Sequence, residues 1–284
     1  MTYFFIGGSA RSGTHLLESI LSLDSAVNPP LAGAAYFHEL VSAYHQGKRN
    51  FKLTADYFAS FDEFHQFHSS WILNFLSNIK QQYPAAEHLI LRWPYMATLF
   101  PTVHKLVPES KFVLIVRDPR DTIASMIKVA ERKKDLPIKE RSVANFNRNI
   151  IRLSSLYSSY YLPCLVKQSQ SVDFREKLIW VQYESLVTNP DSIVAKLKKH
   201  TGLKFDRFDR DNIWQRRKPE FGQQDNLDAW FSPLYGKSIS ASHIGHYRKI
   251  LTDEEIRAIE NQCDFIFKLF AYQKHDLSCK VMSF

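Results

Sequence analysis

The sequence predicts an α/β fold of three layers, a P-loop-like domain in which a central parallel sheet is flanked by helices. Short unbroken apolar runs, bounded by turn residues, alternate with longer helical segments along the 284 residues. Such runs are typical of strands that are covered on both faces, as in a parallel sheet. The first run passes through a loop rich in Gly and Ser directly into a helix, which is typical of phosphate-binding folds.

The apolar runs place the expected strands at about residues 3–6, 88–92, 111–117 and 178–183. Capping residues, prolines and apolar periodicity mark the helices between and after them. The main helices are expected at about 13–23, 119–133, 143–161, 190–200 and 252–269, with a mostly helical region before residue 82. We expect one domain over residues 1–272 and a loose C-terminal tail over residues 273–284.

The loop after the first strand has the composition of an anion cradle, where backbone N–H groups and a helix dipole converge. Gly8 and Gly13 have the spacing of a nucleotide P-loop. However, Thr14 and His15 stand where a nucleoside triphosphatase has Lys, then Ser or Thr for Mg²⁺. The cation is instead Arg11, inside the loop. We therefore expect an anion held by backbone amides and one guanidinium, with no metal ion.

Further cations follow other strands of the predicted sheet. Arg11, Arg92, Arg117 and Tyr183 all lie just beyond the carboxyl end of an expected strand. Ligands of open α/β sheets bind at that edge. The sequence therefore predicts one anion site to which several strands contribute.

Composition indicates which classes of partner the protein can bind and in which compartment it is expected. The formal net charge of +8 fits an anionic cofactor, an anionic polymer or a membrane surface, and does not choose among them. The three cysteines form neither a disulfide framework nor a zinc pattern, so a reducing compartment, the cytoplasm, is expected. No signal peptide and no apolar window of membrane-spanning length is seen. The basic cluster at 216–218 has no nucleic-acid module around it, so no nucleic acid partner is expected.

Two segments resemble the cofactor-binding motifs of sulfotransferases that use 3′-phosphoadenosine 5′-phosphosulfate (PAPS). Residues 7–14, GGSARSGT, resemble the loop that binds the 5′-phosphosulfate, and residues 116–126, VRDPRDTIASM, resemble the segment that binds the 3′-phosphate. Weaker matches follow at 183–187, YESLV, and at 244–249, IGHYRK. Together these matches, in the order of the family, span almost the whole chain.

The resemblance implies roles for individual residues. Arg117 and Ser125 would clamp the 3′-phosphate, while Arg11 and Arg92 would stabilise negative charge on the bridging oxygen of the leaving phosphate. No metal is required for this chemistry. The other residues implied to contact the cofactor are Ala10, Ser12, Gly13, Thr14, His15, Tyr183, Gly245 and Arg248.

The general base does not follow from the motifs. One branch of the family has a Glu about twenty residues after the loop arginine, but residues 30–35 contain no ionisable group. Another branch has a His two residues after the strand-end cation, where this chain has Pro94. The nearest substitutes are His38 and Glu39, and His15 is a third candidate. We expect Glu39 or His38 to act as the base, unless the acceptor needs little help.

The resemblance implies transfer of a sulfuryl group to a hydroxyl or amine, with release of adenosine 3′,5′-bisphosphate. A short chain without a membrane anchor favours a small-molecule acceptor over glycans or protein tyrosines. Two alternatives stay open at this point: a P-loop kinase or nucleotidase that uses Mg-ATP, and a non-catalytic relative that binds a ligand without turnover. The sequence does not indicate an oligomeric state.

Overall fold

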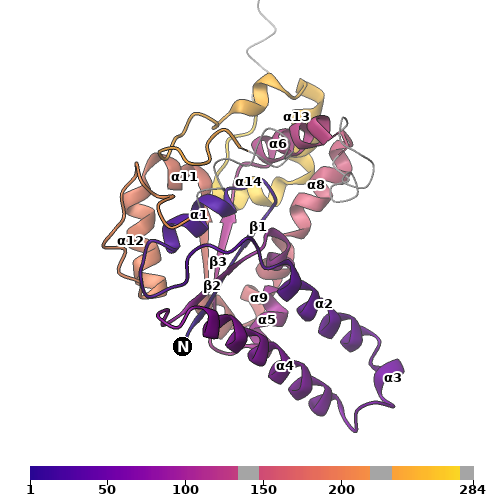
Figure 1. The fold of residues 1–284 in the computed structure, drawn as a ribbon. Helices are drawn as coiled ribbons and strands as arrows, with labels where there is room; N and C mark the ends of the chain where they lie inside the picture. The colour runs from indigo at the N-terminus through magenta and orange to yellow at the C-terminus, as the bar shows by residue number, and fades with distance from the viewer. Residues whose placement is uncertain (134–146, 218–231, 276–284) are drawn as a thin grey trace, which may run out of the picture.

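A computed structural model describes residues 1–133, 147–217 and 232–275. Within this part of the chain the strands form a four-stranded parallel sheet in the order β2-β1-β3-β4 (Figure 1). The strands are β1 (Tyr3–Gly8), β2 (Leu89–Arg92), β3 (Ser110–Val116) and β4 (Leu178–Gln182).

Helices fill the connections between the strands and follow the last one. Those before β3 are α1 (Thr14–Leu21), α2 (Ala35–Arg49), α3 (Phe51–Thr54), α4 (Phe61–Gln82), the 3-10 helix η1 (Pro94–Leu99) and α5 (Phe100–Leu106). Those between β3 and β4 are α6 (Pro119–Lys133), α8 (Ile150–Ser159), α9 (Leu162–Gln170) and α10 (Val172–Lys177). Those after β4 are α11 (Tyr183–Thr188), α12 (Pro190–Thr201), the 3-10 helix η3 (His246–Lys249), α13 (Asp253–Gln262) and α14 (Asp264–Phe270).

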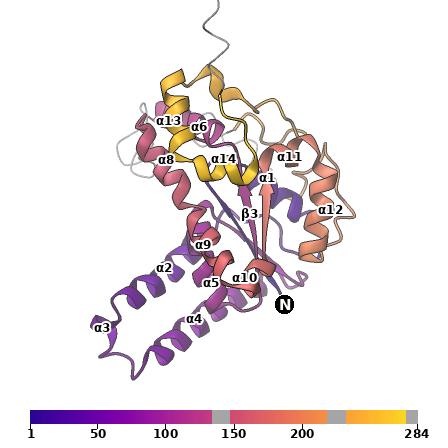
Figure 2. The same cartoon turned by 180° about the vertical axis from the view of Figure 1, so that it is seen from behind.

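Different helices cover the two faces of the sheet. Alternate residues of a strand point to opposite faces, so Phe5 and Phe112 pack in one apolar cluster with residues of α2, α4, α5 and α8. Phe4 and Val113 pack in a second cluster with α1, α11 and α12. Figure 2 shows α9 and α12 on opposite sides of the strands. This arrangement confirms the predicted three-layer α/β fold.

The strand register brings the carboxyl ends together at one edge. Ile6 of β1 lies opposite Arg92 of β2, and Gly8 lies opposite Ile115 of β3. Gln182 ends β4 opposite Val116. The loop after β1 and the residues that follow the other strands therefore meet at a single edge of the sheet.

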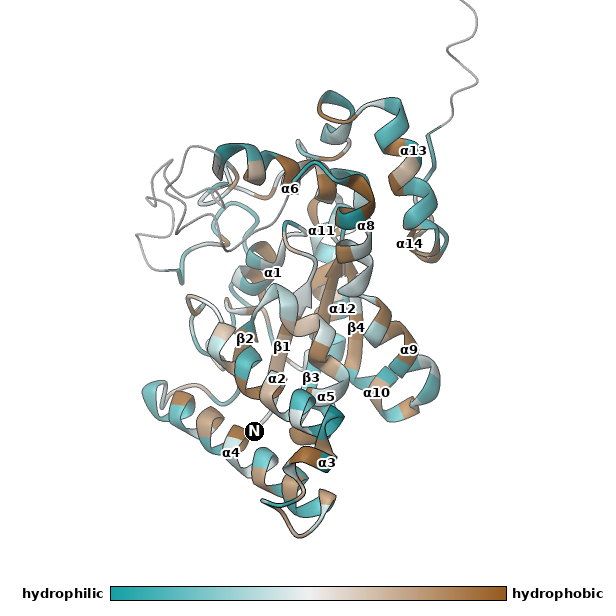
Figure 3. Cartoon of the chain, turned by 90° about the vertical axis from the view of Figure 1, so that its right-hand side faces the viewer, coloured by the Kyte–Doolittle hydropathy of each residue, from teal (hydrophilic) through white to brown (hydrophobic). Residues whose placement is uncertain are grey.

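Helices α2 and α4 form an arm that leads away from the sheet (Figures 1 and 2). Helix α4 begins at Ser60, whose side chain accepts a hydrogen bond from the Glu63 backbone N–H, and acidic residues occupy its first turn. Figure 3 shows apolar residues along the strands, whereas the arm helices alternate between apolar and polar residues, as expected where only one helix face packs.

Two expected helices differ from the structure. The helix expected at 252–269 is divided at Cys263, whose non-helical backbone separates α13 from α14. Within the described part of the helix expected at 143–161, residues 147–149 are not helical and α8 runs from Ile150 to Ser159, because the Asn149 side chain caps its start by accepting from the Arg152 N–H. Residues 134–146 lie outside the described part. Of the expected tail, residues 276–284 also lie outside it, while the His275 N–H donates to Glu260.

Candidate anion-binding site

The loop between β1 and α1 is shaped by backbone conformations that few residues adopt. Gly8, Arg11 and Gly13 all have positive φ angles, of 148°, 72° and 101°. A Cβ atom on Gly8 would lie 2.4 Å from the Ile115 carbonyl oxygen, and one on Gly13 would lie 2.7 Å from the Tyr183 ring. Both positions therefore require glycine, for space as well as for conformation.

The loop leaves the start of α1 available to a ligand. Gly13 is the N-cap of α1, and no side chain caps that end. The first N–H groups of a helix have no partner within the helix, and with the helix dipole they attract anions. Ser12 closes the loop on itself, because its hydroxyl donates to the Ser9 carbonyl at 2.6 Å. The loop therefore has the backbone form that an anion cradle requires, and anion binding stays a prediction.

Two buried tyrosines hold the loop and the end of β3 in register. Tyr161 accepts from the Ser9 N–H at 3.0 Å and donates to the Ile115 carbonyl at 3.2 Å. Tyr157 donates to the Arg117 carbonyl at 2.7 Å. Burial raises the pKa of both phenols, so they remain neutral donors. Neither tyrosine was predicted, because each lies on or beside α8, far from the loop in sequence.

The structure brings Arg11, Ser125 and Arg117 together. Arg11 Nε donates to Ser125 Oγ at 3.1 Å, and an Arg117 terminal nitrogen donates to the Arg11 carbonyl at 3.3 Å. The Arg117 guanidinium also lies 4.5 Å from the centre of the Tyr183 ring. Arg117 Nε is buried and has no hydrogen-bond partner among the described residues. An unsatisfied buried donor beside an anion cradle fits a phosphate oxygen.

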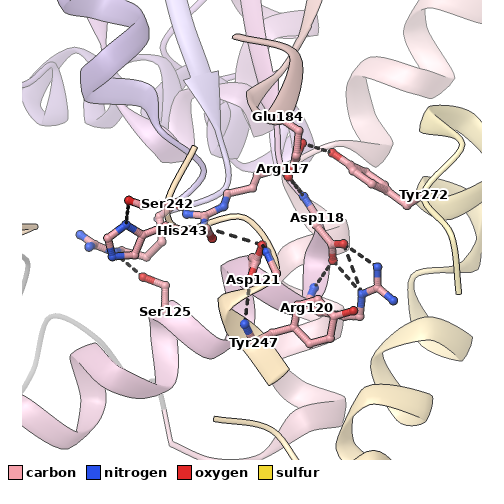
Figure 4. Close-up of polar contacts among 12 residues, drawn as sticks. Arg117, Asp118, Arg120, Asp121, Ser125, Glu184, Ser242, His243, Tyr247 and Tyr272 are labelled. Carbon is pink, nitrogen blue, oxygen red and sulfur yellow. Dashed lines mark hydrogen bonds and ion pairs between the residues drawn. The ribbon is translucent and has the colours of Figure 1, made fainter. Parts of the chain in front are cut away.

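A segment from the C-terminal part of the chain passes close to Arg117. The His243 carbonyl accepts from Arg117 at 2.8 Å (Figure 4). Asp121 accepts from the Gly245 N–H at 2.8 Å and from the Tyr247 N–H at 2.9 Å. Gly245 has a φ of 73° and would place a Cβ 2.7 Å from an Arg248 nitrogen. The predicted residues Gly245 and Arg248 thus lie in a strap, residues 243–248, which Asp121 fixes over the start of α6.

Carboxylates around the strap are matched by donors. Asp118 pairs with Arg120 at 2.6 Å, and Arg120 also pairs with Glu260 at 2.6 Å. Glu184 accepts from the Asp118 N–H at 2.9 Å and from the Tyr272 hydroxyl at 2.7 Å (Figure 4). Burial is the main cause that raises the pKa of Glu184. A carboxylate oxygen of Asp121 lies 3.9 Å from a terminal nitrogen of Arg117, which is long for an ion pair. Arg117 therefore remains able to bind an anion.

Arg92 lies at the same edge in a different environment. Its side chain is 3% exposed, and its Nε donates to Glu18 Oε2 at 2.9 Å. A terminal nitrogen donates to the Ala32 carbonyl at 2.9 Å. Arg217 donates to the same Glu18 oxygen at 2.5 Å and to the His15 carbonyl at 3.1 Å. Glu18 is fully buried, and its carboxylate forms ion pairs with both guanidinium groups.

The three candidates for the general base, His15, His38 and Glu39, lie in two different parts of the structure. Burial lowers the pKa of His15 well below 6.5, and the charges of Arg92, Arg217 and Arg11 lower it further. His15 is therefore neutral and lies among the cations of the site. His38 and Glu39 lie on α2 instead, where His38 Nδ1 is 3.3 Å from a Glu39 oxygen and the Glu39 side chain is 73% exposed.

A row of aromatic contacts connects α2 with the residues at the end of α8. The rings of His38 and Tyr95 lie 6.4 Å apart, and those of Tyr95 and Tyr160 lie 5.1 Å apart. The Tyr160 ring is fully buried, next in the chain to the Tyr161 that holds the loop. The sequence signal for this aromatic row is modest, since its three rings lie on or beside three separate elements.

A sequence model of the sulfotransferase family matches residues 4–207. The chain belongs to the sulfotransferase family. Two nematode proteins, each named "Putative protein-tyrosine sulfotransferase", are similar to it: 25% identity over 207 residues for the one from Caenorhabditis briggsae and 24% over 183 residues for the one from Caenorhabditis elegans. These matches cover 71% and 64% of this chain. The chain spans 65% and 64% of the length of these curated relatives.

Solved sulfotransferase domains share the fold over nearly the full length. The sulfotransferase domain from the curacin biosynthetic pathway superposes with a TM-score of 0.58 at 18% identity, covering 96% of this chain and 99% of that one. The domain from the Synechococcus PCC 7002 olefin synthase gives 0.59 at 16% identity, covering 96% and 94%. At these identities the likeness establishes the sulfotransferase fold alone.

Among the described residues, no helix is long and apolar enough to cross a bilayer. Within the same ranges no group of three or more His, Cys, Asp and Glu side chains is arranged to hold a metal ion.

Proposed function

We propose that this protein transfers the sulfuryl group of PAPS to a hydroxyl or amine acceptor and releases adenosine 3′,5′-bisphosphate. The observation that carries the proposal is the contact of Arg11, Ser125 and Arg117 at the mouth of the β1–α1 loop. A donor with two separated phosphate groups needs two anion sites at a fixed spacing. The loop amides of residues 10–15 would hold the 5′-phosphosulfate, and Arg117 with Ser125 would hold the 3′-phosphate.

The strap would help to orient the adenosine bisphosphate. Its backbone is fixed by Asp121 and Arg117, and Arg248 lies 4.8 Å from the centre of the Tyr247 ring. Tyr183, which packs against both Gly13 and Arg117, would keep the two anion sites at their spacing. Positioning of this kind supplies much of the rate in group transfer between bound partners.

In the transfer step the acceptor oxygen or nitrogen forms a bond to sulfur, while the bond from sulfur to the bridging phosphate oxygen breaks. The electron pair of that bond goes to the leaving bisphosphate. Arg11 would stabilise this charge directly. Arg92 would act beside it, although Glu18 neutralises part of its charge. The acceptor proton would go to the His38–Glu39 pair, where the carboxylate can orient the imidazole.

The acceptor class is proposed from two considerations. The half-buried ring of Tyr95 suits a small apolar molecule that carries a hydroxyl. The names of the two nematode relatives point to a tyrosine hydroxyl of a protein. Both acceptors present a hydroxyl to the same sulfur, so the test includes a small phenol and a tyrosine peptide, each incubated with PAPS. Sulfated phenol alone would support the small-molecule acceptor, and sulfated peptide alone would overturn it.

The cofactor is tested by thermal shift with adenosine 3′,5′-bisphosphate, AMP and Mg-ATP. A ligand that binds only the folded state raises the melting temperature. We expect stabilisation by the bisphosphate alone, and loss of about 2 kcal/mol of binding energy, about 30-fold in Kd, in Arg117→Ala.

Arg257→Ala is the matched control, since Arg257 is exposed on α13 and, within the described part of the chain, pairs only with exposed Glu254. It should bind like the wild type. Stabilisation by Mg-ATP, abolished by EDTA, would indicate the kinase or nucleotidase instead. Binding of the bisphosphate without turnover of any acceptor would indicate a non-catalytic relative.

A further inference from the structure

A basic cavity lies on the other side of the molecule from the anion-binding site. It has a volume of about 340 Å³ and lies among α2, α5 and α9. Helix α5 leads into β3, and α9 leads through α10 into β4, so the cavity lies toward the amino ends of the strands. In Figures 1 and 2, the cavity helices α2, α5 and α9 lie apart from α6 and α13. Its lining includes four cations, Lys48, Arg49, Lys105 and Lys167, together with Tyr44 and Pro101.

The cavity lining holds cations without carboxylates. Lys48, Arg49 and Lys105 are exposed, and Lys167 is half-buried at the wall. None of these four forms an ion pair with a described residue. The nearby carboxylate of Asp173 is occupied by Lys177 at 3.0 Å and by His104 at 3.1 Å.

Like charges are held close together in this cavity. The neighbouring Lys48 ammonium lowers the pKa of Lys105 more than burial does. Burial lowers the pKa of His45, which also lines the cavity, and the charges of Arg49 and Lys48 lower it further. Burial likewise lowers the pKa of His65, whose Nδ1 lies 3.0 Å from the Tyr44 hydroxyl; Asp62 opposes this shift, and Lys105 and Lys48 add to it. Cations that converge from two helices without a counterion repel each other, and a bound anion removes that repulsion.

We propose that this cavity docks an acidic segment of another protein. The cavity is much larger than one sulfate ion, and its cations project from three separate helices rather than around one point. Buried Tyr44 and half-buried Pro101 add apolar surface between the charges. Several carboxylates on an extended chain match this spread of long cationic side chains and apolar surface. The docking surface is independent of the proposed sulfuryl transfer.

Fluorescence anisotropy with a labelled hexaglutamate peptide tests the proposal on the full chain. We expect Lys48→Glu/Lys105→Glu to bind the peptide at least tenfold more weakly than the wild type. The matched control is Lys196→Glu/Lys199→Glu, two exposed positions on α12 with the same change of net charge. It should bind within twofold of the wild type. The neutral pair Lys48→Gln/Lys105→Gln should fall between the two.

Several results would overturn the docking proposal. Equal losses in both charge-reversed variants would mean attraction by net charge alone. Full displacement of the peptide by millimolar sodium sulfate, but not by sodium chloride of equal ionic strength, would indicate a small-anion site. Tighter binding of a short RNA than of the peptide would indicate a nucleic acid partner, and no binding would leave no docking site. Because adenosine 3′,5′-bisphosphate should still stabilise Lys48→Glu/Lys105→Glu, failure here is separate from failure of the sulfuryl-transfer proposal.

Discussion

Glu18 is the single residue on which the cations of the site most depend. It is fully buried, yet it accepts hydrogen bonds from both Arg92 and Arg217. Removing one partner of a buried ion pair leaves charge in a medium that cannot solvate it. The geometry of Arg92 beside the β1–α1 loop therefore depends on a carboxylate that has no exposed surface.

Glu18→Gln keeps the shape of this side chain and removes its charge. We expect the free energy of unfolding to fall by about 3 kcal/mol, because two buried guanidinium groups lose their counterion. Urea denaturation measures this loss. Glu254→Gln, which alters an exposed pair with Arg257, is the control and should leave stability unchanged. A stable Glu18→Gln variant would show that another group neutralises the arginines.

His15 predicts a dependence of stability on pH. Burial and three arginines hold its folded pKa well below the ordinary 6.5, so the unfolded chain takes up the proton first as pH falls. The neutral histidine therefore contributes stability above pH 6.5 that is lost as pH falls below it. We expect the free energy of unfolding to decline less between pH 7.5 and about 5 in His15→Gln than in the wild type. Parallel curves would contradict this assignment, since all other histidines are common to both proteins.

At the scale of elements, two positions of the β1–α1 loop, Gly8 and Gly13, accept only glycine. Gly13 and Gly202 both have left-handed backbones, with φ of 101° and 81°. A Cβ on Gly13 would meet the Tyr183 ring at 2.7 Å, whereas one on Gly202 would meet nothing within 4 Å. Comparing alanine substitutions at Gly13 and Gly202 therefore separates the cost of the left-handed backbone from the cost of the steric clash.

Gly202→Ala should cost about 1 kcal/mol of stability, the cost of a left-handed backbone alone. Gly13→Ala should cost about 3 kcal/mol, because the ring must also move. Thermal unfolding measures both values. Gly13→Ala should also lose binding of adenosine 3′,5′-bisphosphate, while Gly202→Ala should keep it. Equal costs for the two variants would mean that Tyr183 moves aside freely.

The elements themselves follow from the sequence wherever local patterns decide them. Each expected strand is present within two residues, because unbroken apolar runs can only be buried on both faces in a sheet of this kind. The break at Cys263 was not predictable, since the apolar periodicity continues across it from Ile256 to Phe267.

The site was predictable only in its contiguous parts. The loop around Arg11 and the segment around Arg117 each carry their pattern within a few neighbouring residues. The bond from Arg217 to Glu18 joins residues 199 positions apart, and no local pattern in the chain indicates it. The basic cluster at 216–218 was visible in the sequence, but its partner on α1 was not.

At the scale of the whole molecule, two sets of cations are handled in opposite ways. At the carboxyl edge of the sheet, Glu18 holds Arg92, and the carbonyls of Arg11 and His243 hold Arg117. No carboxylate among the described residues lines the cavity among α2, α5 and α9. Fixed cations suit a small ligand of defined geometry, while exposed cations on long side chains suit a partner whose charges can adapt.

The central place of β1 has a consequence for synthesis of the chain. Its partners are residues 89–92 and 110–115, and β3 then pairs with residues 178–182. During translation the apolar segment Tyr3–Gly8 therefore emerges long before either neighbour exists. Sheets whose strands are far apart in sequence fold slowly, and hydrophobic surface stays exposed until the strands pair. The yield of this protein in a cell should accordingly depend on chaperones that shield the nascent chain more than on the stability of the finished fold.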